Sequence, residues 1–167
     1  FRIPVITYDG FEADDIIGTI AKATSVKTII ITGDKDSFQL VDNETEVHFT
    51  KRGITDVEVY NINNFTEKTS LVPSQIIDLK ALMGDASDNI PGVAGVGEKT
   101  AKGLLNQYQT LDGVYEHIDE IKGKLKEKLI AEKDNAYLSK ELATICVDCG
   151  VEYSIDDLRF PFPLDSK

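Results

Sequence analysis

The chain has 167 residues, enough for one domain with a small attached subdomain, and 41% of them are hydrophobic, which argues against global disorder. Acidic residues outnumber basic ones by 29 to 18, and the net charge of −11 argues against nucleic-acid binding through bulk charge and against a basic membrane-binding patch. It does not exclude an enzyme whose acidic side chains hold metal ions. The sequence has no apolar run of about 18 residues and no leader pattern, and its two cysteines are too few for a disulfide framework. These features predict a soluble, intracellular globular protein.

The first sixty residues are predicted to form an α/β layer. Short strands are expected at Val5–Tyr8 and Lys27–Thr32, the second being a β-branched run typical of a buried parallel strand. Between them, Asp14 is the predicted N-cap of a helix over Asp15–Ala23. A helical turn at Ser37–Val41 and two strands follow, at Glu46–Thr50 and Asp56–Tyr60.

Helical patterns replace strands from residue 61 onward. Pro73 occupies a position favoured in the first turn of a helix, and the helix predicted over Ser74–Met83 ends at Gly84. The other predicted helices are Asn61–Lys68, Glu98–Tyr108, Leu111–His117 and Lys124–Lys140. The chain is therefore expected to divide into an α/β part (1–60), a helical part (61–150) and a C-terminal segment or linker (151–167) that contains two prolines.

Three groups of carboxylates follow the ends of predicted elements. They are Glu12, Asp14 and Asp15; Asp34 and Asp36; and Asp85 and Asp88. The carboxyl ends of parallel strands meet at one edge of a sheet, so the first two groups are expected to lie together. Carboxylates gathered in this way repel one another unless a cation compensates, and oxygen ligands without His or Cys suit Mg²⁺ or Mn²⁺ rather than zinc.

Each acidic group also has a structural explanation. Acids at a helix N-terminus interact favourably with the helix dipole, and an acid pair after a strand is common turn chemistry. The prediction of a metal site therefore depends on the combination of the three groups rather than on any one of them.

A glycine-rich hairpin, IPGVAGVGEKTA, lies between two predicted helices at residues 90–101. It is not a P-loop, because Glu98 separates Gly97 from Lys99. It is typical of a helix-hairpin-helix, in which glycines let the backbone approach a ligand and the next helix offers free N–H groups to a phosphate. The candidate phosphate-binding residues are Gly92, Gly95, Gly97, Lys99, Thr100 and Lys102.

Three segments, YDGFEADDIIGTIA, TGDKDSFQLV and ALMGDASDNIPGVAGVGEKTA, carry a resemblance over about residues 5–150. In order and spacing they resemble the 5′-nuclease (flap endonuclease-like) family, most nearly the 5′→3′ exonuclease domain of bacterial DNA polymerase I. The resemblance implies a PIN-like parallel-sheet nuclease core in residues 1–60, followed by a helix-hairpin-helix (helix-three-turn-helix) subdomain that grips duplex DNA in residues 61–150.

The same resemblance implies a metal-dependent 5′→3′ exonuclease and 5′-flap endonuclease of DNA replication and repair. All seven acidic residues would hold two Mg²⁺ or Mn²⁺ ions, with Asp14, Asp34 and Asp36 as the direct catalytic ligands and Asp85 rather than Asp88 in the outer sphere. The hairpin at Gly92–Thr100 would bind K⁺ through backbone carbonyls. The implied partners are DNA with a 5′ flap or 5′ end and a polymerase domain of the same chain. The protein would be a monomer in the bacterial cytoplasm, associated with the nucleoid and not with a membrane.

The chain departs from the family at its beginning. It starts at Phe1 and its only methionine is Met83, so we expect a fragment. The family's first metal-binding strand, a further acidic motif and a helical arch would lie upstream, which predicts an incomplete core.

Three alternatives remain at this point. The first is a non-catalytic fragment that binds DNA structures and is active only with the upstream segment. The second is a PIN-type ribonuclease, against which the hairpin at 90–101 argues. The third is a metal-dependent phosphatase, which would need a nucleophilic aspartate on its first strand.

Overall fold

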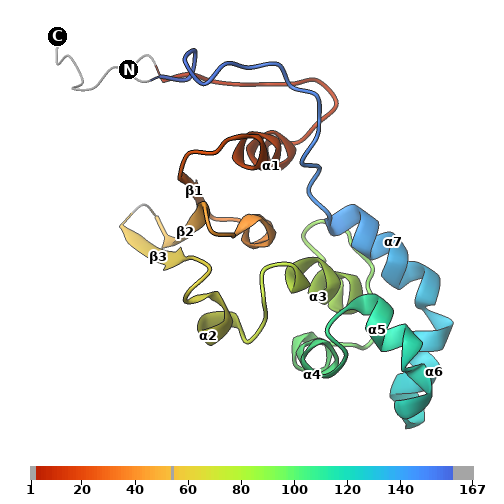
Figure 1. The fold of residues 1–167 in the computed structure, drawn as a ribbon. Helices are drawn as coiled ribbons and strands as arrows, with labels where there is room; N and C mark the ends of the chain where they lie inside the picture. Colours follow the sequence, from red (N-terminus) through yellow and green to blue (C-terminus); the bar gives the residue numbers. More distant parts are fainter. Residues whose placement is uncertain (1–2, 54, 160–167) are drawn as a thin grey trace. The chain divides into compact units, whose positions relative to one another are not determined.

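The computed structural model describes residues 3–53 and 55–159. The chain divides into two compact units, a larger one over Val26–Ile145 and a smaller one formed by residues 1–25 and 146–167 (Figure 1). None of the helices among the described residues is both long and apolar enough to span a bilayer. The C-terminal segment predicted at 151–167 lies partly outside the described residues, and the division at residue 60 stays a prediction.

The larger unit begins with a three-stranded sheet in the order β1-β2-β3 (Figure 1). Strand β1 (Thr28–Thr32) pairs in parallel with β2 (Thr45–Arg52), and β2 pairs antiparallel with β3 (Asp56–Tyr60). Successive side chains of β1 point to opposite faces, so that Ile30 is buried while its neighbours are exposed. The predicted strand and its parallel pairing are confirmed, and β3 makes the sheet mixed. The expected burial of the strand is wrong, because Ile29 and Ile31 are 50% and 71% exposed.

An aromatic cluster forms the core beside this sheet. The 3₁₀ helix η1 (Asp36–Leu40) places the Phe38 ring 5.5 Å from Phe49, 4.3 Å from Tyr60 and 5.8 Å from Phe65, measured between ring centroids. Phe65 belongs to α2 (Phe65–Thr69) and is fully buried. Aromatic contacts of this kind add to the stabilisation from area burial. The cluster therefore fixes η1, and with it Asp36, against the sheet.

Helices make up the rest of the larger unit. Helix α3 (Gln75–Met83) contacts α4 (Glu98–Tyr108), α5 (Leu111–Glu116) and α7 (Lys133–Ala143) (Figure 1). The side chain of Leu82 in α3 is completely buried. The remaining helical elements are η2 (Ile118–Glu120) and α6 (Gly123–Ala131). Because α3 packs against several helices, the position of its last residue, Met83, is held in place, and the turn that contains Asp85 and Asp88 follows directly.

The smaller unit contains α1 (Ala13–Ala23) and the segment that starts at Cys146. The backbone N–H of Cys146 donates to Asp15 Oδ1 at 2.8 Å, and that of Cys149 donates to Thr19 Oγ1 at 3.1 Å. Cys149 is buried and its Sγ accepts from the Thr19 hydroxyl at 3.2 Å. Both cysteines are free thiols, and the backbone of each is hydrogen-bonded to α1.

Three predicted features are wrong. Residues 5–8 form no strand, and Val5, which is 84% exposed, shows that no neighbouring strand covers this segment. The N-cap of α1 is Glu12 rather than Asp14, because Asp15 accepts the Glu12 N–H at 3.1 Å. The single helix predicted over Lys124–Lys140 is broken at Glu132, whose backbone leaves the helical region between α6 and α7.

Candidate metal centre and phosphate-binding hairpin

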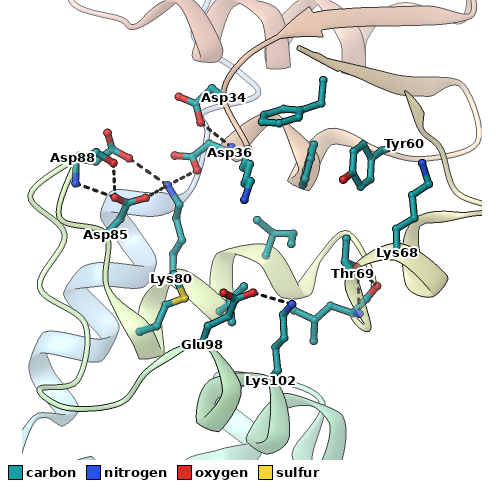
Figure 2. Close-up of a pocket in the computed structure, with 18 of the residues that line it drawn as sticks. Asp34, Asp36, Tyr60, Lys68, Thr69, Lys80, Asp85, Asp88, Glu98 and Lys102 are labelled. Atoms are coloured by element: carbon teal, nitrogen blue, oxygen red, sulfur yellow. Dashed lines mark hydrogen bonds and ion pairs between the residues drawn. The ribbon is translucent and has the colours of Figure 1, made fainter. Parts of the chain in front are cut away.

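Four of the seven predicted carboxylates come together in the larger unit, at one end of a cavity (Figure 2). Asp34 and Asp36 follow the C-terminal end of β1, as expected, and Asp85 and Asp88 lie in the turn after α3. One oxygen each of Asp36, Asp85 and Asp88 lies within 4.8 Å of the others. Oxygen atoms at this spacing can surround one hard divalent cation, so the donor set fits such an ion.

Local hydrogen bonds orient these carboxylates. Asp34 Oδ1 accepts the Asp36 N–H at 2.9 Å, and the Asp34 N–H donates to Thr32 Oγ1 at 2.9 Å. In the second turn, Asp85 Oδ1 accepts the Ser87 N–H at 2.9 Å. Side-chain acceptors of this kind are typical of Asx turns. The Oδ1 atoms of Asp34 and Asp85 thus each accept a backbone N–H of their own turn, and the Oδ2 atom of each takes no part in that turn.

A lysine that the acidic pattern did not reveal stands inside the cluster. Lys80, in the last turn of α3, is 9% exposed, and its Nζ lies 2.9 Å from Asp85 Oδ2, 3.1 Å from Asp88 Oδ2 and in contact with Asp36 Oδ1 (Figure 2). The sequence contains no local signal for this role, because the burial of Lys80 comes from the packing of α3 against its neighbours.

The pKa values of these groups follow from this ion-pair network. Burial disfavours the Lys80 ammonium, but hydrogen bonds to Asp36 and Asp85 outweigh it and raise the pKa of Lys80 above its ordinary value. The hydrogen bond from Lys80, helped by Ser87, lowers the pKa of Asp85. For Asp36, burial dominates over the nearby ammonium and raises its pKa. The Lys80 ammonium and the Asp85 carboxylate therefore both stay charged at neutral pH.

The cavity has a volume of about 650 Å³ and its lining changes character from end to end (Figure 2). Opposite the carboxylates lie Tyr60 and Lys68, whose ammonium stands 4.8 Å above the Tyr60 ring. Glu98 and Lys102, 2.8 Å apart, line a third side. The arrangement places cationic side chains within one cavity with an acidic cluster.

The predicted hairpin forms as a tight turn between α3 and α4. Asp85 and Ile90 exchange backbone hydrogen bonds of 2.9 and 2.8 Å. Gly84 and Gly92 have φ angles of +74° and +61°, and their backbones are so close that a Cβ on Gly92 would lie 2.2 Å from Gly84 N. The Gly92 N–H donates to the buried Ser139 Oγ of α7 at 2.8 Å. Glycine is required here because the turn needs both a left-handed backbone and the absence of a side chain.

The other hairpin residues lie at the start of α4. Gly97 is its N-cap, Lys99 and Thr100 are in the first turn, and Lys102 pairs with Glu98. The Gly95 carbonyl accepts a hydrogen bond of 3.4 Å from Lys128 of α6. The backbone therefore exposes a helix N-terminus of the kind that binds phosphate, with lysines near it.

The remaining predicted ligands, Glu12, Asp14 and Asp15, lie at the start of α1 in the smaller unit. Both oxygens of Asp15 accept backbone N–H groups, from Glu12 and from Cys146. Asp15 thus has a structural role in the smaller unit, and a role of these three residues in metal binding stays a prediction.

Comparisons with known proteins agree on one family. Residues 1–70 match the model of the 5′-3′ exonuclease N-terminal resolvase-like domain, and residues 71–165 match that of the 5′-3′ exonuclease C-terminal SAM fold. DNA polymerase I of Bacillus subtilis is 50% identical over 164 residues and that of Geobacillus stearothermophilus is 52% identical over 166 residues. Each alignment covers 96% of this chain and 19% of the relative, so the chain spans about one fifth of the length of these relatives.

Solved structures give the same result. A zinc-bound T5 5′-exonuclease matches with a TM-score of 0.75 and 26% identity, over 89% of this chain and 55% of that one. A bacteriophage T5 flap endonuclease in complex with DNA and metal ions matches with a TM-score of 0.71 and 25% identity, over the same shares.

Proposed function

Because the chain belongs to the 5′-3′ exonuclease family, we propose that it is the metal-dependent 5′→3′ exonuclease and 5′-flap endonuclease part of a DNA polymerase I. The observation that carries this proposal is the convergence of Asp36, Asp85 and Asp88 on one point beside the DNA-binding type of hairpin. The family match favours this nuclease over a PIN-type ribonuclease or a phosphatase.

The acidic cluster would hold the catalytic metal. Asp36, Asp85 and Asp88 would ligate it directly, because their oxygens lie within 4.8 Å of one another, which replaces the outer-sphere place expected for Asp85. Asp34, expected as a direct ligand, accepts the Asp36 N–H and stays a proposed ligand beside this group. Two Mg²⁺ or Mn²⁺ ions are the proposed cofactors, with Glu12, Asp14 and Asp15 as the further ligands. Such ions activate a water molecule and stabilise the leaving oxygen of a phosphodiester. The chain's own contribution is to fix the carboxylates through the Asx turns and the buried end of α3.

The hairpin would position the DNA. Backbone N–H groups at Gly97 and in the first turn of α4, together with Lys99, Thr100 and Lys102, would contact phosphates without reading the base sequence. Gly92 and Gly95 would let the backbone come close, and backbone carbonyls of the same turn are the proposed K⁺ ligands. The substrate supported by this reasoning, and by the DNA complex of the T5 relative, is duplex DNA with a 5′ flap or 5′ end. A monomer associated with the bacterial nucleoid stays a prediction.

A cleavage assay tests the proposal. The 167-residue chain is incubated with 5′-labelled flap DNA and Mg²⁺ or Mn²⁺, and compared with Asp36→Asn and with the control Asp119→Asn, an exposed aspartate paired with Lys126. We expect Asp36→Asn to lower cleavage at least about a hundredfold, more than the loss of a residue that only orients a ligand usually costs.

Each other result has a definite meaning. Cleavage that survives Asp36→Asn would contradict the metal site. Binding of flap DNA without cleavage would support the second candidate, a DNA-structure-binding fragment that needs the upstream segment for catalysis. Neither binding nor cleavage by the folded chain would contradict both candidates.

A further inference from the structure

The cation inside the acidic cluster is supplied by the chain itself. The Lys80 ammonium contacts Asp36 and lies 2.9 and 3.1 Å from oxygens of Asp85 and Asp88 (Figure 2). These are the three carboxylates whose oxygens lie within 4.8 Å of one another. The position best suited to a divalent ion is thus also the position in which Lys80 is stabilised.

A divalent ion at this point and the Lys80 ammonium would lie only a few ångströms apart. Like charges a few ångströms apart repel strongly in a half-buried site. Conversely, without any cation the three carboxylates, whose oxygens lie within 4.8 Å of one another, would repel one another. The cluster is therefore stable with either Lys80 or a metal ion at its centre.

Lys80 has a direction in which to move. Its long side chain lines the cavity of about 650 Å³, and Glu98 lines the same cavity and carries a carboxylate (Figure 2). Rotation about the bonds of its four-methylene stem would carry the ammonium toward this cavity while the backbone of α3 stays in place.

We propose that Lys80 is a positioning residue that acts as an exchangeable counter-cation, an inference that rests on the proposed metal site. It holds Asp36, Asp85 and Asp88 in ligand geometry while the site contains no metal, and it leaves the cluster when a divalent ion binds. Lys80 thereby sets the metal affinity of the site, because each binding event must first break its three ion pairs.

The test is a Mg²⁺ titration of the 167-residue chain followed by NMR. The backbone amide resonances of Asp36, Asp85 and Ser87 report occupancy of the site, and the Nζ resonance of Lys80 reports its displacement. The titration is repeated with Lys80→Met, which keeps the apolar stem, and with Lys140→Met as the matched control. Lys140 is also a partly buried lysine that pairs with two aspartates, Asp78 at 3.0 Å and Asp112 at 3.6 Å, outside the cluster.

We expect the Lys80 resonance to shift with the same midpoint as the amides in the wild type. In Lys80→Met the Mg²⁺ concentration at half-saturation falls at least about tenfold, because Mg²⁺ no longer has to break the hydrogen bonds between Lys80 and the carboxylates. Without metal, the Lys80→Met variant also has a lower melting temperature than the wild type, and addition of Mg²⁺ raises the melting temperature of the variant more than that of the wild type. Lys140→Met leaves the midpoint unchanged. If Lys80→Met does not fold without metal, Lys80→Gln, which keeps a polar head group, replaces it.

Two results would overturn the proposal in distinguishable ways. An equal or weaker Mg²⁺ affinity in Lys80→Met, with normal binding by the wild type, overturns the role of Lys80 and leaves the metal site intact. The absence of any wild-type response at Asp36 and Asp85 contradicts the metal site and the role of Lys80 together.

Discussion

The contact between Gly84 and Gly92 makes a sharp prediction about stability. A Cβ added to Gly92 would lie 2.2 Å from Gly84 N and 2.6 Å from its Cα, and neither atom belongs to a flexible side chain. The left-handed backbone of Gly92 alone costs an alanine about 1–2 kcal/mol. If the turn opens to relieve the overlap, the buried bond to Ser139 is lost at about 1–3 kcal/mol. Gly92→Ala should therefore lower the free energy of unfolding by about 2–5 kcal/mol.

Urea denaturation followed by circular dichroism measures this effect, with Gly97→Ala as the matched control. Gly97 lies in the same turn with an extended backbone, and a Cβ there would meet no atom within 4 Å. Its replacement by alanine should cost at most about 1 kcal/mol, the usual effect of a poorer N-cap. Equal losses in the two variants would refute the argument that the glycine pair is required by backbone contact.

Two further predictions concern the helices. Gly103 is exposed inside α4, with a helical backbone and open space around it, so Gly103→Ala should raise the free energy of unfolding by about 0.5–1 kcal/mol, and an unchanged urea midpoint would contradict this. The Tyr115 hydroxyl donates to the Leu129 carbonyl at 3.0 Å, and burial, with Asp134 and Glu132 nearby, raises its pKa to about 12. Because the folded-state pKa exceeds the unfolded value of about 10, the stabilisation is present below pH 10 and is lost as the pH rises toward 12. Melting temperatures from pH 9 to 11.5 should thus fall more steeply in the wild type than in Tyr115→Phe, and parallel curves would show that Tyr115 does not contribute.

Local patterns predicted most of the elements of the larger unit. Strand β1 and helix α4 were predictable because a β-branched run and a glycine-bounded amphipathic segment have few other stable structures. The strand predicted at Val5–Tyr8 failed because a strand needs a paired neighbour, which a local pattern does not reveal. The break at Glu132 has no glycine or proline to announce it, so the periodicity predicted one helix where the structure has two.

The four acids of the candidate site were among those that the sequence singled out, whereas the lysine between them was not. The expectation that Glu12, Asp14 and Asp15 lie beside Asp34 and Asp36 stays a prediction. Asp34 and Asp36 follow a strand and Asp85 and Asp88 follow a helix, so their spacing in the sequence carried the information. Lys80 was missed because a lysine in a helix is usually a solvated residue, and only the packing of α3 turns this one toward the carboxylates. A local sequence pattern does not show which distant side chains a buried lysine such as Lys80 will contact.

The central claim is that a divalent cation binds at Asp36, Asp85 and Asp88. The most direct measurement is a titration of the isotope-labelled chain with sub-stoichiometric Mn²⁺, in which paramagnetic broadening marks the amides nearest to the ion. The account predicts that the amides of Asp36, Asp85 and Ser87 broaden at the lowest Mn²⁺ concentration and that Asp85→Asn weakens this response. Broadening that starts instead in another acidic stretch, such as residues 42–46 or 152–157, would contradict the account.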